Sequence, residues 1–301
     1  MSKKKTAKKK KPAKKKPKKK NSGAAQPAAL PPVRSIESHL AGIAGMGFQE
    51  RSAVDEAQEI IYDAWEAPTR PRAVALARKA LTVSADCADA YNLLAELTSK
   101  SLDQAIDLFR KGVAAGERAL GNKTFKDDVG HFWGILETRP YMRARAGLAQ
   151  NLWDAGQYEE AFEHYREMLR LNTNDNQGNR YLLMPRLLEK NRDEEAEKLY
   201  LQFEGDVMAI WTYSRVLLDF CKHGESAVAN KSLKAALAGN EYVPAYLLGR
   251  KKMPRDLPDY HGFGDDNEAI ICVHESKTAW KATPGAMEWL ADKMRLSDTI
   301  T

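Results

Sequence analysis

Small and apolar residues recur along the chain with the spacing of short amphipathic helices. The pattern is clearest from 143 to 175, where such positions return every three or four residues on two successive segments. Gly156 separates the segments, and a glycine at this place is typical of a turn between helices. The positions are Leu148, Ala149, Leu152, Tyr158, Ala161, Phe162, Tyr165, Met168 and Leu169. The stretch therefore predicts two helices packed as a hairpin.

The predicted helical hairpin recurs at a nearly constant step. A small residue opens the second helix of each pair at Ala73, Ala105, Ala161, Ala196 and Ala229, so the steps are 32, 56, 35 and 33 residues. The long step becomes ordinary once an insertion of about 22 residues, 121–142, is removed. This unit resembles the tetratricopeptide repeat, a helix–turn–helix of about 34 residues. A single repeat cannot bury its apolar face, so the copies must stack.

The resemblance implies an all-α, tetratricopeptide-like, right-handed helical solenoid. We expect this solenoid to occupy residues 35–301, which end in a capping helix at 284–296 that covers the last repeat. The insertion 121–142 separates the second repeat from the third. The predicted repeats lie at about 52–82, 89–119, 143–175, 177–205, 211–239 and 243–281.

A lysine-rich tail precedes the predicted repeats. Residues 1–20 hold 13 Lys and no acid, which leaves 34 basic and 41 acidic residues, a net charge of −7, for the remainder. Because like charges repel and no core can form, residues 1–34 are predicted to be a disordered tail and linker. The tail residues that we single out are Lys8, Lys9, Lys10, Lys11, Lys14, Lys15, Lys16, Lys18, Lys19 and Lys20.

Three roles are open for this tail. Residues 3–20 could neutralise phosphates and bind nucleic acid without sequence preference. They could instead dock on acidic protein surfaces, including the acidic remainder of this chain, or serve solubility without a partner. Base stacking is not expected, because no aromatic residue interrupts the lysines.

Several classes of protein are disfavoured by the sequence. The three cysteines lie far apart, so neither a zinc site nor a disulfide framework is expected. No apolar run reaches the roughly 18 residues of a membrane span, so we expect no integral membrane segment and a cytoplasmic protein. Nuclear or nucleoid association could follow from the lysine tail. Nucleotide-binding, hydrolase and metalloprotease motifs are absent, so we expect neither an enzyme nor a cofactor.

The first helix of each repeat lines the concave wall of a tetratricopeptide array. Projecting the repeat onto this chain predicts a groove that suits an extended peptide or a helix from a protein partner. We therefore expect an interaction scaffold or adaptor. Packing between repeats is the alternative role for the two tryptophans. The predicted groove residues are Asn92, Glu96, Arg143, Gln150, Trp153, Tyr181 and Trp211.

The insertion 121–142 is a second candidate site, because long segments between repeats are often functional. It could cover the groove as a lid or plug, and it would be the site if the protein were an enzyme. Alternatively, Phe132 and Trp133 simply pin the segment to the stack. Its candidate residues are His131, Phe132, Trp133, Arg139 and Tyr141.

Four short stretches carry a closer resemblance. AYNLLAEL at 90–97, VPAYLLGRK at 243–251, DDNEAI at 265–270 and GAMEWL at 285–290 resemble the suppression-of-tumorigenicity-7 family and its bacterial relatives. The resemblance implies solenoid-like helices and supplies no reaction or catalytic residue. Eukaryotic members have membrane segments near the N-terminus, where this chain has its lysine tail, so membrane location is not implied. A nucleic-acid-associated protein with the solenoid as a secondary module is the main alternative function.

Overall fold

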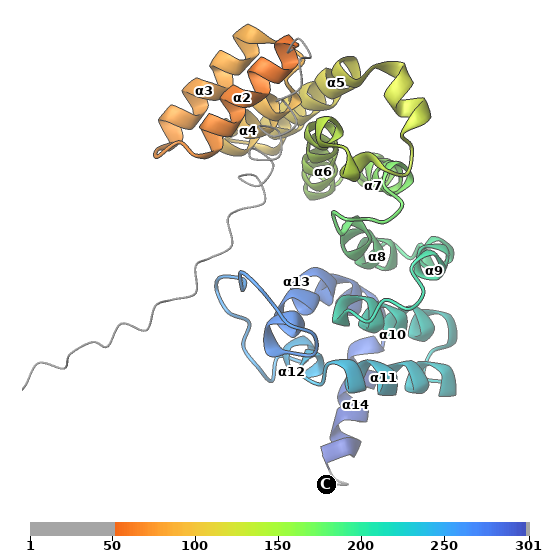
Figure 1. Cartoon of the computed structure of the whole chain (residues 1–301). Coiled ribbons are helices and arrows are strands. Elements are labelled where there is room, and N and C mark those ends of the chain that lie inside the picture. Colours follow the sequence, from red (N-terminus) through yellow and green to blue (C-terminus); the bar gives the residue numbers. More distant parts are fainter. Residues whose placement is uncertain (1–51, 299–301) are drawn as a thin grey trace, which may run out of the picture.

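The computed structural model describes residues 52–298 of the chain, with side chains to residue 295. This part is an all-α helical solenoid, which confirms the predicted fold class (Figure 1). The predicted tail and linker, 1–34, lie outside the described residues. Five helix pairs follow one another: α2 (Ala53–Trp65) with α3 (Arg70–Val83), α4 (Ala88–Thr98) with α5 (Leu102–Asp127), α6 (Arg139–Asp154) with α7 (Tyr158–Leu171), α8 (Asn179–Glu189) with α9 (Asp193–Gln202), and α10 (Ala209–His223) with α11 (Ala227–Gly239).

Side-chain caps fix where several of these helices begin. Ser52 and Asp55 form a capping box, in which each side chain accepts the backbone N–H of the other residue. Ser101 and Ser226 cap α5 and α11 through single hydrogen bonds to the first turn. Gly156, at φ 76°, makes the left-handed turn that reverses the chain between α6 and α7.

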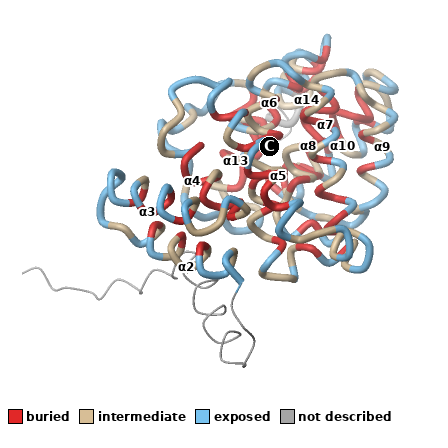
Figure 2. The backbone as a smooth tube through the Cα atoms, turned by 90° about the horizontal axis from the view of Figure 1, so that it is seen from above, coloured by how far each residue is buried: buried red, intermediate tan, exposed pale blue. Residues whose placement is uncertain are grey.

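Small residues allow the helices to approach closely. Ala161, Ala196 and Ala229, which open the second helices, are fully buried. Gly147 of α6 lies against the ring of Phe109 of α5, and a Cβ atom at this position would collide with that ring. Buried positions lie between neighbouring helices, whereas α3 and α9 also carry many exposed positions (Figure 2). The small positions of the repeat are therefore the contact points of the fold.

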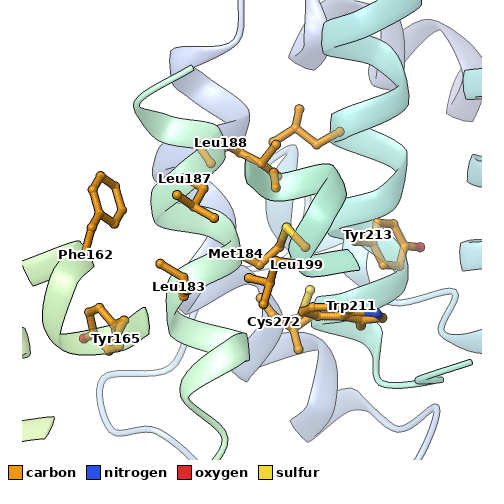
Figure 3. Packing of buried hydrophobic residues seen from close by; sticks show 14 of the residues in the cluster. Phe162, Tyr165, Leu183, Met184, Leu187, Leu188, Leu199, Trp211, Tyr213 and Cys272 are labelled. Carbon is orange, nitrogen blue, oxygen red and sulfur yellow. The ribbon is translucent and has the colours of Figure 1, made fainter. Parts of the chain in front are cut away.

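Helix α8 lies at the centre of the larger core. Its Leu183 and Leu187 lie on the side of Phe162 and Tyr165, which belong to α7 (Figure 3). Other core side chains around α8 come from α9, α10 and α13: Leu199, Trp211, Tyr213 and Cys272. Side chains from four helices thus surround α8.

The C-terminal part does not stack as a further regular pair. After the short helix α12 (Val243–Leu247) and the connection 248–265, helix α13 (Asp266–Ala282) packs against α8 and α10 as well as α12. Because α8 and α10 are first helices of their pairs, α13 lies along the wall where the concave groove was predicted. Its buried side chains are Glu268, Ala269, Ile270, Cys272, Val273, Ser276, Ala279 and Trp280.

Helix α14 (Ala286–Asp298) follows Gly285, which has φ 80°. Its Trp289 ring lies 4.9 Å from that of Phe220, centroid to centroid, so α14 packs against α10. The bounds of α14 are within two residues of those predicted for the capping helix, 284–296.

Candidate partner-binding surface

A buried ion pair joins the first helices of the second and third pairs. Arg143 of α6 donates from Nε to Asp89 Oδ1 at 2.9 Å, and Asp89 is only 1% exposed. Burial opposes ionisation of Asp89, yet the Arg143 guanidinium and the amides of Asn92 and Gln58 hold its pKa below the usual value. The Arg143 guanidinium also lies 5.2 Å from the centre of the Trp65 ring. Three first helices, α2, α4 and α6, are thereby linked.

Asn92, a predicted groove residue, serves this junction and is buried. Its amide donates to Asp89 Oδ1 and to the carbonyl oxygen of Pro140, both at 3.0 Å. Glu96 follows one turn later on α4, and its side chain is exposed. Of these two predicted residues, Glu96 is therefore the one that reaches solvent.

Further along α6, Gln150 and Trp153 lie beside a buried cation that the sequence analysis missed. Gln150 donates to Asp154 at 3.0 Å and accepts a hydrogen bond from Arg186 of α8. The Arg186 guanidinium lies 5.0 Å from the Trp153 ring centre and also donates to the Tyr165 hydroxyl. Burial lowers the pKa of Arg186. The sequence offers one signal for this buried cation, because Arg186 stands within the apolar run LLMPRLL at 182–188.

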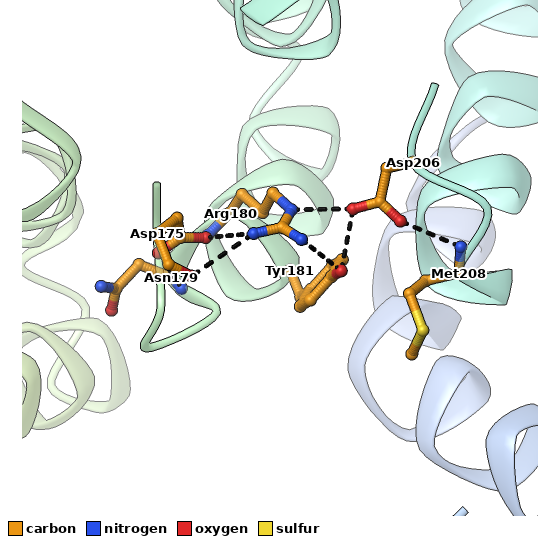
Figure 4. A network of polar contacts seen from close by, with 6 residues as sticks. All are labelled: Asp175, Asn179, Arg180, Tyr181, Asp206 and Met208. Carbon is orange, nitrogen blue, oxygen red and sulfur yellow. Dashed lines mark hydrogen bonds and ion pairs between the residues drawn. The ribbon is translucent and has the colours of Figure 1, made fainter. Parts of the chain in front are cut away.

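Figure 4 shows that Tyr181 belongs to a polar network. Its hydroxyl donates to Asp206 Oδ2 at 2.8 Å, and Arg180 Nε donates to the same oxygen at 2.8 Å. Arg180 also pairs with the buried carboxylate of Asp175 at 3.0 Å, and Asp206 caps Met208 N at 3.0 Å. The network connects the loops on either side of the α8–α9 pair, so Tyr181 is half-buried and structurally engaged.

Trp211 lies in the core rather than on an accessible wall. Its side chain is fully buried, stacked on Tyr200 at 5.7 Å between ring centroids, and Cys272 of α13 lies beside it (Figure 3). The neighbouring wall residues Ser214 and Leu218 are also buried. Because α13 packs against α8 and α10, the predicted groove does not extend to Trp211.

The insertion 121–142 is largely built into the stack. Helix α5 bends at Gly121 (φ 65°, ψ 166°) and continues to Asp127, and two short 3-10 turns follow at Phe132–Gly134 and Leu136–Thr138. Gly130 N donates to Leu171 O at 2.9 Å, which ties the segment to the end of α7.

The aromatic residues of the insertion differ in their exposure. Phe132 and Tyr141 are buried, and both rings contact Phe125 at centroid distances of 5.2 and 5.1 Å. Trp133 is half-buried, and Arg139 donates from Nε to its carbonyl oxygen at 2.9 Å. His131 is exposed. Phe132 and Tyr141 thus pack in the core, whereas His131 reaches solvent.

From the exposed and half-buried side chains of α4 and α6 we select one surface, the inner face, which we define as Glu96, Arg143, Gln150, Trp153 and Asp154. It mixes two exposed carboxylates with an amide, an indole and a cation already paired with Asp89. The candidate lysines at positions 8–20 lie outside the described residues. Among residues 52–298, no helix combines the length and apolar character that crossing a membrane requires.

Comparison with known proteins confirms the resemblance to the suppression-of-tumorigenicity-7 family. The chain is 24% identical to a Protein ST7 homolog of Caenorhabditis elegans, across 77% of this chain and 50% of that protein. It is 25% identical to the Suppressor of tumorigenicity 7 protein-like of Rattus norvegicus, across 77% of this chain and 45% of that protein. The chain thus spans about half the length of these relatives. No family model and no solved structure matches it.

Proposed function

We propose that the protein is an interaction scaffold or adaptor that holds a peptide or helix of a partner along the inner face. Stacked helix pairs supply a long wall without needing a catalytic centre, which is the common use of repeat solenoids. The similarity to the suppression-of-tumorigenicity-7 family is compatible with this role. The proposal is of a binding protein rather than an enzyme, and it includes a cytoplasmic location.

The charge arrangement of the inner face is the observation that carries the proposal. Arg143 is paired with Asp89, and the exposed carboxylate of Asp154, which accepts hydrogen bonds from Gln150, keeps a negative charge at the surface. Beside them, Trp153 offers a half-buried indole, and aromatic residues often anchor protein interfaces. A partner segment with basic side chains and an apolar anchor would complement this surface.

Affinity capture with the full chain tests the proposal. The variant Glu96→Lys/Asp154→Lys reverses both inner-face carboxylates, and Glu163→Lys/Glu194→Lys changes two exposed carboxylates on α7 and α9 as a matched control. We expect partners recovered by the wild type and the control to fall at least tenfold with the inner-face variant, at unchanged thermal stability. Equal recovery by all three proteins would rule out this surface.

A second activity is proposed for residues 3–20. Thirteen positive charges in residues 1–20 favour salt-sensitive, sequence-independent association with nucleic acid, or with acidic surfaces. Such association would favour a nuclear or nucleoid location over a purely cytoplasmic one. Deleting residues 1–20 should abolish retention on DNA and RNA at low salt, measured by filter binding. Unchanged retention would place nucleic-acid binding elsewhere in the chain.

A further inference from the structure

A cleft of about 580 Å³ opens between the second helices α7 and α9. Its apolar lining comes from Leu169 of α7, Leu183 and Leu187 of α8, Leu199 of α9, and Val129 of the insertion. Each of these leucines is nearly buried, so the apolar surface lies deep between the helices rather than on an exposed patch. We call this feature the α7–α9 cleft.

The rim of the α7–α9 cleft is polar and carries more cations than carboxylates. Arg166 crosses from α7 to Glu195 of α9, with Nε 3.1 Å from Oε2, and so these two charges neutralise each other. Arg170 forms an ion pair with Glu167 on its own helix at 2.7 Å. Within residues 52–298, Lys198 forms no ion pair within 4 Å and is exposed at the rim.

An apolar interior with a few polar groups at its mouth is the usual design of a small-ligand site, and the volume lies within the common range of about 300–1,000 Å³. The positive charge of Lys198, which has no carboxylate partner among the described residues, favours a ligand with a negatively charged end group. An apolar chain would cover the four leucines, while its head group would reach Lys198 at the rim. Arginine and lysine both pair readily with carboxylate and phosphate.

We infer that the α7–α9 cleft binds a small amphipathic anion, namely an apolar chain that ends in a carboxylate or a phosphate. The inference rests on a different surface from the inner face and goes beyond the scaffold function. Binding at this cleft would place a small-molecule site on the second-helix side of the solenoid, away from α13.

Fluorescence titration of the full chain with 11-(dansylamino)undecanoate tests this inference, because the dansyl group brightens in apolar surroundings. Competition with dodecanoate and with dodecyl phosphate distinguishes the two head groups, and dodecyltrimethylammonium is the cationic control. The variant Lys198→Glu reverses the charge at the rim, and Thr173→Trp adds bulk at the exposed mouth. Lys231→Glu, on the exposed side of α11, is the matched control.

We expect saturable probe binding that dodecanoate or dodecyl phosphate displaces and the cationic amphiphile does not. Lys198→Glu and Thr173→Trp should each weaken binding at least tenfold, and Lys231→Glu should leave it within twofold. Absence of saturable binding would overturn the inference, and so would equal binding by all variants. Binding of an acidic amphipathic peptide, but of none of the small anions, would contradict it in favour of a protein partner at this cleft.

Discussion

The Asp89 carboxylate on α4 and the Arg143 guanidinium on α6 form a buried ion pair between residues 54 positions apart in the chain. Asp89 precedes the insertion 121–142 in the chain and Arg143 follows it. The ion pair therefore holds the second helix pair against the third. Replacing Asp89 with Ala would leave a mostly buried cation without its carboxylate, which usually costs about 3–5 kcal/mol. Urea unfolding of Asp89→Ala should show a loss of this order.

The exposed pair Asp86–Arg118 is the control for this variant, since both side chains are more than a third exposed. Asp86→Ala should change the free energy of unfolding by less than about 1 kcal/mol. Similar losses of unfolding free energy from Asp89→Ala and Asp86→Ala would show that the buried pair stabilises the fold no more than an exposed pair does.

The same pair predicts a pH dependence. The folded-state pKa of Asp89 is depressed, so its stabilisation is present above the unfolded value of about 3.9 and is lost as pH falls through the folded pKa. The difference in unfolding free energy between wild type and Asp89→Asn should be constant from about pH 7 to pH 5 and shrink in more acid solution. A difference that grows as the pH falls would contradict the assigned direction.

Gly147 predicts a steric limit at the α5–α6 contact. A methyl group there would collide with the Phe109 ring, and overpacking of this kind costs about 1–3 kcal/mol. Gly147→Ala should lower the midpoint of thermal unfolding. Gly239→Ala, where a Cβ meets nothing within 4 Å, is the control and should be neutral or slightly stabilising. An unchanged midpoint for Gly147→Ala would show that the helices are not so closely packed.

The rate at which each cysteine is alkylated shows whether α13 stays packed on α8 and α10. Burial raises the pKa of the Cys272 thiol, and it raises that of Cys87 to about 12, so both should resist alkylation by iodoacetamide in the native protein. Cys221 is half-buried and should react first, although burial also raises its pKa. Peptide mass spectrometry after timed labelling measures the order. Rapid labelling of Cys272 would mean that α13 leaves the wall.

The helix pairs could be predicted because small residues must stand where two helices touch. Ala161, Ala196 and Ala229 mark those contacts in the sequence and are fully buried in the structure. The position of α13 could not be predicted in this way. Its apolar residues suit either the outer helix of a further repeat or a helix laid against the wall, and only the packing on α8 and α10 distinguishes the two.

The candidate site was harder to predict than the fold. Projection of the repeat placed Arg143, Gln150 and Trp153 on one helix, and all three lie on α6. Such a projection cannot show which wall positions another element covers. Trp211, for example, is fully buried, with its ring stacked on Tyr200 of α9 and Cys272 of α13 beside it. Arg186 was missed because a cation between leucines does not fit the repeat pattern, and its contacts with Gln150 and Tyr165 depend on tertiary packing.

Site-specific photo-crosslinking can show whether a partner lies along the inner face. A benzoylphenylalanine residue is placed at 154 on the inner face or at 163 on the outer side of α7, both exposed positions, in the full chain. If the inner face holds the partner, a polypeptide should crosslink from position 154 and not from position 163. Crosslinking of the same partner from 163 alone, or equally from both positions, would contradict the claim that the inner face holds it.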